Sequence, residues 1–109
     1  MTRDFDDISG PDMAEWCALL ADDNQIHLTR EAAEAAGFGP RRVNPGPANL
    51  AYLMTLVSED LAHVDARFSG NVFEGDDLTA SAAPTDEGAE ARLTRDGETL
   101  LTALFKVRP

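Results

Sequence analysis

The chain has 109 residues, enough for one domain spanning residues 1–109 and too few for two. Hydrophobic residues make up 43% and charged residues 27%, as in an ordinary globular protein. Nine basic against twenty acidic residues give a net charge of −11, which repels nucleic-acid phosphates and argues against such partners. No apolar run approaches the roughly 20 residues that span a bilayer. The acidic N-terminus lacks the apolar stretch of a secretory signal, so we expect a cytoplasmic protein without membrane contact.

Cysteine and cofactor motifs narrow the chemistry further. The single cysteine, Cys17, excludes an internal disulfide and a cysteine-based metal cluster. It lies in an apolar helical pattern and is interpreted as an inert core thiol. The sequence has no glycine-rich phosphate loop and no metal motif, so no metal and no resident cofactor are expected. A domain this small buries a limited core, which makes oligomerisation a natural source of stability.

The first part of the chain predicts a short strand and two small helices. Residues 3–8 are interpreted as an edge strand. The run Ser9-Gly10-Pro11-Asp12 is a helix start, and apolar residues at helical spacing continue it to about residue 21. The run Asp22-Asp23-Asn24 predicts a turn. Thr29 is then the expected N-cap of a second helix, which Gly37 ends.

The remainder predicts one buried helix followed by a sheet. The helix begins at Gly46-Pro47 and continues through ANLAYLMTLVSEDL, a stretch that is apolar on most of its circumference and is therefore typical of burial. The period then changes to the alternation of half-buried strands. Asp96-Gly97 is a tight-turn signal between the last two strands. Helices followed by a covering sheet indicate an α+β fold. The strands are expected around residues 64–70, 78–82, 89–94 and 99–107.

The segment ADDNQIHL, residues 21–28, holds the residues best suited to acid–base chemistry. Asp22 and His27 can hold a water between them, one accepting a proton while the other donates. Adding water across a polarised double bond requires such a pair. Asn24 can orient that water or fix a side chain without titrating. Structural roles for these residues, and a metal site formed with Asp23, are the alternatives, although three ligands in a flexible turn specify a metal poorly. His63 is interpreted as a partly exposed residue at a helix-to-strand junction.

Gly46 and two arginines supply the second group of candidates. The Gly46 N–H lies at the positive end of the buried helix, and no side chain blocks approach to it. Such an amide can stabilise negative charge that develops on a thioester carbonyl oxygen. Arg41 and Arg42, the only adjacent basic pair, are candidates for binding an anionic substrate in this acidic chain.

The stretch ADDNQIHLTREAAEAAGFGPRRVNPGPANLAYL resembles the signature region of MaoC-like, (R)-specific enoyl-CoA hydratases. Those proteins carry an Asp-x-Asn-Pro-(Ile/Val/Leu)-His segment, a short helix, a Val-His-Gly turn and then the buried helix. The glycine whose amide forms the family's oxyanion hole falls on Gly46. VFEGDDLTASA resembles the family's entry into the sheet, and Asp76 in it is interpreted as a turn residue. The motif's aspartate, asparagine, aliphatic residue and histidine fall on Asp22, Asn24, Ile26 and His27.

The resemblance covers roughly residues 14–107 and implies the hot-dog fold, an antiparallel sheet wrapped around a long central helix. It also implies a homodimer, with the acyl chain bound near the subunit interface. Asp22 and His27 would activate water, Asn24 would support them, and Gly46 would bind the thioester oxygen. Water would then add to a trans-2-enoyl thioester to give an (R)-3-hydroxyacyl thioester, or leave in reverse. The carrier is either CoA or an acyl-carrier protein, whose phosphopantetheine is part of the substrate.

Two departures from the family pattern keep alternatives open. Gln25 replaces the proline of the motif. Val43-Asn44-Pro45-Gly46 replaces Val-His-Gly, without the histidine and with a residue more, which adds Asn44 to the substrate-binding candidates. One alternative is a thioesterase of the same fold, although such enzymes need no Asp-x-Asn-x-x-His loop. The other is a non-catalytic subunit that binds an acyl ligand within a heteromer. The intact Asp22–His27 set favours the hydratase, and the altered turn favours the subunit.

Overall fold

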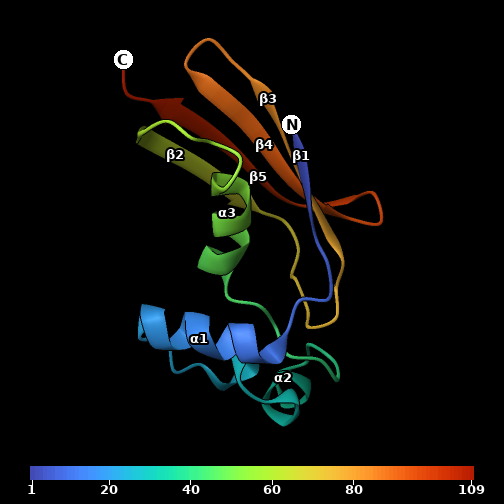
Figure 1. The fold of residues 1–109 in the computed structure, drawn as a ribbon. Coiled ribbons are helices and arrows are strands. Elements are labelled where there is room, and N and C mark those ends of the chain that lie inside the picture. The colour runs from blue at the N-terminus through green and yellow to red at the C-terminus, as the bar shows by residue number, and fades with distance from the viewer.

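The computed structural model describes residues 1–109 and combines helices with one antiparallel sheet (Figure 1). The sheet has five strands in the order β1-β3-β4-β5-β2. This α+β architecture confirms the prediction from the sequence. The strands are β1 (Thr2–Phe5), β2 (Leu61–Phe68), β3 (Leu78–Pro84), β4 (Gly88–Arg95) and β5 (Glu98–Val107). The helices are α1 (Gly10–Leu20), α2 (Arg30–Ala35) and α3 (Gly46–Met54), with one 3₁₀ turn, η1 (Gln25–His27).

The helices occupy two places relative to the sheet. Helix α3 lies against one face and contacts β3, β4 and β5, whereas α1 and α2 gather at one end of the sheet (Figure 1). The loop between α2 and α3 links these two regions. None of the helices has the length and apolar character needed to cross a membrane.

The first two helices begin where the sequence predicts. The Ser9 side chain accepts a hydrogen bond from Asp12 N at 3.2 Å, and the Thr29 side chain accepts one from Ala32 N at 3.1 Å. Each side chain thereby satisfies a backbone donor that has no partner within the helix. Helix α1 buries Cys17 on its inner side, as predicted. Burial, followed by the Asp22 carboxylate, raises the pKa of the Cys17 thiol, which keeps it protonated and unreactive.

Helix α3 is shorter than predicted. It ends at Met54, whereas the apolar pattern runs on to Leu61, which is the first residue of β2. Leu61 pairs with Val107 of β5, so the chain must leave the helix and return to the sheet within residues 55–60. Leu56 remains buried although it follows the end of the helix. The apolar pattern therefore continues past the end of the helix because the core requires apolar side chains in this segment, whether or not its backbone is helical.

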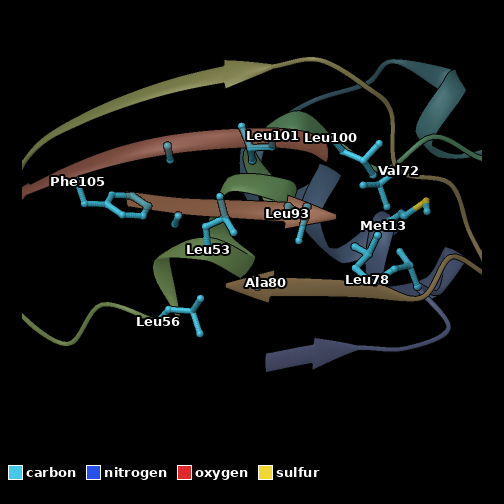
Figure 2. Packing of buried hydrophobic residues seen from close by; sticks show 13 residues of the cluster. Met13, Leu53, Leu56, Val72, Leu78, Ala80, Leu93, Leu100, Leu101 and Phe105 are labelled. Carbon is cyan, nitrogen blue, oxygen red and sulfur yellow. The ribbon is translucent and has the colours of Figure 1, made fainter. Parts of the chain in front are cut away.

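A row of small residues lets α3 approach the sheet. Alanines of β3, β4, β5 and β2 lie opposite one another along the ladder, at positions 82, 91, 103 and 66. Larger apolar side chains from the strands, from the α3 segment and from α1 fill the space on either side (Figure 2). Interlocking of large and small side chains produces the close packing of a protein interior. The largest buried members are Met13, Leu53, Val72, Leu78, Leu93, Leu100, Leu101 and Phe105.

The three C-terminal strands form the predicted meander. Asp96 and Gly97 have φ angles of 50° and 81°, the left-handed pair that a type I′ turn between β4 and β5 requires. The first edge strand, β1, pairs with β3. His63 lies exposed on β2, beside an irregularity in the pairing with β5; its exposure is confirmed, whereas it belongs to the strand and not to a helix-to-strand junction.

Candidate active site

The turn after α1 holds the Asp22 carboxylate in place. Ala21 adopts a left-handed conformation, with φ 53°, and ends the helix. The Asp22 side chain then accepts a hydrogen bond from Asn24 N at 2.9 Å through Oδ1. The Asn24 side chain accepts one from Ile26 N at 3.2 Å and so caps η1. Asn24 therefore positions the turn that leads from Asp22 to His27, and its supporting role in catalysis stays a prediction.

His27 is buried, and its two ring nitrogens have different neighbours. Nδ1 lies 2.6 Å from the Val43 carbonyl oxygen, so it carries a proton and donates it to that oxygen. Nε2 lies 3.5 Å from Asp22 Oδ2. In the neutral ring Nε2 then has a free lone pair on the side of the carboxylate. The structure thus brings Asp22 and His27 together, as the spacing in the sequence predicted.

The pair is open to solvent on one side. The Asp22 side chain is 34% exposed and that of His27 is 10% exposed. A separation of 3.5 Å between Nε2 and Oδ2 is longer than the 2.7–2.9 Å of a charge-assisted hydrogen bond. A water beside the pair can donate one hydrogen bond to Nε2 and the other to the carboxylate, because both are acceptors when the ring is neutral. The geometry supports proton transfer to or from a molecule held next to them.

Gly46 presents an unpaired N–H at the start of α3. It is the first residue of the helix, its N-cap is Pro45, and no side chain caps this end. The Gly46 N–H donates no hydrogen bond within the chain. A Cβ added at Gly46 would meet only the Phe68 ring, at an ordinary contact distance of 3.6 Å. The fold alone does not require glycine here, whereas close approach of a ligand to this amide would.

The segment that leads to Gly46 is tied to the histidine. The Val43 N–H donates to the Ile26 carbonyl at 3.0 Å, while the Val43 carbonyl receives the His27 proton. The Asn44 N–H donates to the Val72 carbonyl at 2.7 Å. These bonds fix residues 43–46 against both the η1 turn and the loop before β3. The candidate acid–base pair and the candidate amide consequently share one rigid support.

Arg42 is held by a carboxylate that the sequence analysis did not assign. Arg42 Nη1 lies 3.1 Å from Glu74 Oε2, and the Arg42 N–H donates to Glu74 Oε1 at 3.0 Å. Arg30 forms a second, two-pronged pair with the same carboxylate, at 2.7 and 3.2 Å. The Arg30 hydrogen bonds, outweighing the effect of burial, lower the Glu74 pKa to about 2. The sequence shows an acidic residue, Glu74, directly before Gly75, but it does not indicate that Arg30 and Arg42 are its partners.

Arg41 is bound to a second buried carboxylate. Arg41 Nη1 lies 3.0 Å from Asp76 Oδ1, and Arg95 Nη1 lies 2.7 Å from Asp76 Oδ2. Asp76 also accepts a hydrogen bond from Phe73 N at 2.8 Å, so its interpretation as a turn residue is confirmed. The Arg41 side chain remains 48% exposed, and its guanidinium covers the Phe73 ring at 5.0 Å. Substrate binding by Arg41 and Arg42 stays a prediction, and both side chains already have structural partners.

Asn44 belongs to a buried polar group beside α3. Its Nδ2 donates to Asn49 Oδ1 at 2.7 Å and lies 3.4 Å from the Tyr52 hydroxyl. Asn44 and Asn49 are 3% and 4% exposed. The sequence analysis gave Asn44 a substrate-binding role but missed Asn49 and Tyr52, because both lie within an otherwise apolar helix pattern.

No protein-family model matches the sequence, and no curated protein sequence matches it significantly. Solved structures do resemble it over nearly its full length. An (R)-hydratase from A. caviae involved in PHA biosynthesis shares 19% identity with a TM-score of 0.82, covering 99% of this chain and 95% of that one. A MaoC-like dehydratase from Rhodospirillum rubrum shares 18% identity with a TM-score of 0.73, covering 100% and 94%.

A third similar structure is a complex of different chains. The HadBC (3R)-hydroxyacyl-ACP dehydratase complex from Mycobacterium tuberculosis shares 19% identity with a TM-score of 0.78, covering 99% of this chain and 95% of that one. At these identities the likeness shows the fold. The chain has the hot-dog fold of the (R)-hydratases and MaoC-like dehydratases, as the resemblance in the sequence implied.

Proposed function

We propose that the chain is an enoyl-thioester hydratase, or dehydratase in reverse, which interconverts trans-2-enoyl and (R)-3-hydroxyacyl thioesters. The observation that carries the proposal is the pair formed by Asp22 and His27, 3.5 Å apart, one half-exposed and the other buried. His27 is hydrogen-bonded to the segment that leads to Gly46, and the Gly46 N–H can donate to the thioester oxygen. The likeness to an (R)-hydratase and to dehydratases supports the same reaction class.

The pair returns to its starting protonation after each turnover. The Val43 carbonyl fixes one proton on His27 Nδ1, so the reacting proton moves between the water, Nε2 and the Asp22 carboxylate. The water gives one proton to the pair as its oxygen bonds to C3 of the enoyl group. The pair gives one proton to C2, and the C2–C3 double bond becomes single. General acid–base catalysis of this kind typically contributes about 10²–10⁴-fold.

The Gly46 amide stabilises the charge that develops during addition. When water attacks C3, negative charge moves through C2 onto the thioester carbonyl oxygen. An N–H without a partner, at the positive end of α3, is oriented for that oxygen before the reaction begins. The substrate carbonyl therefore lies at Gly46, with C3 facing the water between Asp22 and His27.

The working unit we propose is a homodimer formed through the edge strand β2. Antiparallel pairing of two β2 strands about Ala66 places Asp65 opposite Arg67 of the second copy. On the face toward α3 it places Val64 opposite Phe68, which is 53% exposed in the single chain. Opposite charges and apolar pairs across strands are both stabilising. Because the Phe68 ring borders Gly46, the candidate site would lie beside this interface.

A non-catalytic subunit of a heteromer is the alternative. Its support is the likeness to a chain of the HadBC complex, together with a Val43–Gly46 turn that departs from the family pattern. Such a subunit would bind an acyl thioester without turning it over and would acquire activity only with a second, related chain. An intact acid–base geometry has no purpose in that role, so we place it second.

Products formed from a trans-2-enoyl-CoA test the proposal. The hydratase yields an (R)-3-hydroxyacyl-CoA, which chiral analysis of the product detects, and it releases no free thiol. Release of CoA thiol would instead indicate the thioesterase. Binding of the enoyl-CoA without any product, restored to turnover by a co-purifying chain, would indicate the subunit role.

A further inference from the structure

The start of α3 leaves a single backbone donor free. Pro47 has no N–H, and the N–H groups of Ala48 and Asn49 both donate to the Pro45 carbonyl, at 3.0 and 3.3 Å. No side chain caps this end of the helix. The Gly46 N–H is therefore the one free donor here, whereas an α-helix ordinarily begins with four N–H groups that lack intrahelical partners. The position of this donor depends on how the segment before Gly46 is held against the helix.

A buried pair of side-chain amides joins the two sides of Gly46. Asn44 precedes Gly46 by two positions, and Asn49 follows it by three, in the first turn of α3. Asn44 Nδ2 donates to Asn49 Oδ1 at 2.7 Å. Both side chains are buried, so neither is placed to touch a substrate. The pair can act on a bound molecule only through the backbone that it holds.

Stability does not account for two amides at these positions. Asn44 Oδ1 is fully buried and has no hydrogen-bond partner. If Asn44 and Asn49 are both rotated by half a turn, their mutual bond is kept, and an unpaired NH₂ group replaces the unpaired oxygen. A buried polar atom without a partner is unfavourable, whereas apolar groups of the same shape in place of both partners are nearly neutral or stabilising. An apolar pair would therefore serve the core at least as well.

We infer that the Asn44–Asn49 pair positions the Gly46 N–H for the transition state and lowers the stability of the fold, an inference that rests on the proposed function. The Asn44 N–H donates to the Val72 carbonyl at 2.7 Å and so ties residue 44 to the loop before β3. The Asn44 side chain ties the same residue to α3. The two bonds hold the backbone that leads to Gly46 from two directions, and neither uses the Gly46 N–H itself.

The positioning acts on kcat and not on KM. Negative charge develops on the thioester oxygen only as water adds, so the Gly46 N–H stabilises the transition state more than the bound substrate. A displaced N–H therefore lowers kcat and leaves KM nearly unchanged. A pair that only supported the fold would change the melting temperature instead. Stability and turnover consequently distinguish the two roles.

Two leucine variants separate positioning from stability. Asn49→Leu leaves the Asn44 amide buried without a partner and should lower both the melting temperature and kcat. Asn44→Leu/Asn49→Leu removes both amides, and the φ angle of Asn44 is not positive, so leucine can adopt its backbone conformation. In this double variant we expect a melting temperature at or above that of the wild type. For enoyl-CoA hydration we expect kcat to fall by about 10–10²-fold and KM to stay within about twofold.

Thr55→Val is the matched control. It replaces a polar side chain by an apolar one of similar size in the turn after α3, and its hydroxyl bonds only to the Tyr52 carbonyl. Both kcat and the melting temperature should stay at the wild-type values. A double variant with wild-type kcat, or with a raised KM at unchanged kcat, would overturn the inference and leave the hydratase intact. A double variant less stable than the wild type would show that the pair is structural, which also overturns it.

A measurement without turnover separates this inference from the proposed function. If the wild type hydrates no enoyl-CoA, the proposed function fails, and ¹⁵N relaxation of the Gly46 amide decides whether the pair positions it. We expect an order parameter of about 0.85 in the wild type and below about 0.6 in Asn44→Leu/Asn49→Leu. Equal order parameters in the two proteins would overturn the inference.

Discussion

At the scale of single residues, the two nitrogens of His27 have separate tasks. Nδ1 is committed to the Val43 carbonyl at 2.6 Å, and only Nε2 faces Asp22. A substitution that removes the whole ring would disturb both. Asparagine can keep a donor near the Nδ1 position while it removes Nε2, so it separates positioning from proton transfer.

We predict that His27→Asn and Asp22→Asn each lower kcat for enoyl-CoA hydration by about 10²–10⁴-fold, because each removes one acid–base group. In Asp22→Asn the side-chain oxygen can still accept the Asn24 N–H, so the turn is kept. Circular dichroism and thermal unfolding serve as the fold controls. Asp23→Asn, at the exposed neighbouring position, is the matched variant and should retain activity. Wild-type turnover in His27→Asn would remove His27 from the mechanism.

Gly46 offers a second test at this scale. A Cβ at this position meets the Phe68 ring at 3.6 Å, an ordinary contact, so Gly46→Ala should fold with a melting temperature close to that of the wild type. The added methyl group would obstruct approach of the thioester oxygen to the N–H. We expect kcat/KM to fall by about 10²–10³-fold, the usual cost of losing one such donor. Unchanged steady-state kinetics would show that the carbonyl binds elsewhere.

The sequence predicted the proximity of Asp22 and His27 better than it predicted their surroundings. Asp22 and His27 are five positions apart with turn-forming residues between them, so local chemistry alone brings them together. The Val43 carbonyl that orients His27 is a backbone group, so the residue type at that position does not reveal the interaction. The partners of Arg41 and Arg42 lie more than thirty positions away along the chain. Such long-range pairs are set by the tertiary fold.

At the scale of elements, two ion-pair groups fasten α2 and the loop before α3 to the turn before β3. Glu74 binds Arg30 and Arg42, while Asp76 binds Arg41 and Arg95. Both carboxylates are buried, at 9% and 5% exposure. These groups hold the segment that carries the Gly46 amide, and removing a carboxylate would leave arginines without partners.

The lowered pKa of Glu74 predicts that the stability of the fold depends on pH. Its pKa is lowered from 4.5 to about 2 in the folded chain, chiefly by Arg30. Its ionised form therefore stabilises the fold above pH 4.5, and this contribution is lost as pH falls from about 4.5 to 2. We expect Glu74→Gln to lower the free energy of unfolding at neutral pH by about 1–3 kcal/mol, because solvent screens part of the interaction with Arg30, whose side chain is 62% exposed.

Urea unfolding of wild type and variant between neutral pH and pH 3 measures this effect. The difference between them should be constant above about pH 5 and should shrink at lower pH. Glu87→Gln is the matched control, since its pair with Lys106 is exposed on both sides and should contribute about 1 kcal/mol or less. A difference for Glu74→Gln that stays the same at every pH would contradict the ionic account.

Element types were predictable here, and element ends were less so. Helix starts were predictable because Ser9 and Thr29 cap through local hydrogen bonds. The end of α3 was not predictable, because Leu56 is buried in the core and an apolar residue is required there in a turn as well as in a helix. The start of β2 is decided by pairing with a strand at the far end of the chain. Local patterns carry no information on that pairing.

At the scale of the whole molecule, the sheet ends in an eight-residue strand with one unpaired edge. Strand β2 pairs only with β5, so its outer backbone groups have no partner in the sheet. Exposed edges of this kind invite pairing with another chain. Near this edge, Phe68 of β2 is 53% exposed on the face toward α3, and Leu104 of β5 is 47% exposed on the opposite face. The proposed dimer would cover the Phe68 ring and complete the wall beside Gly46.

Charge exchange on β2 tests the proposed pairing. With Asp65 opposite Arg67 of a second copy, Arg67→Asp sets carboxylates against each other at two symmetric positions and should weaken the dimer at least tenfold. The double variant Asp65→Arg/Arg67→Asp restores opposite charges and should recover the wild-type dissociation constant. Analytical ultracentrifugation measures both. A double variant as weak as the single one would reject this register, and a monomeric wild type would reject the dimer.

The central claim is that this chain adds water to an enoyl thioester through Asp22 and His27. The most direct measurement is the loss of the conjugated enoyl chromophore when the purified chain meets trans-2-enoyl-CoAs, with Asp22→Asn in parallel. We predict absorbance loss with the wild type and a rate lower by about 10²–10⁴-fold in the variant. Equal rates for the two, or no absorbance loss with any of the trans-2-enoyl-CoAs, would contradict the claim.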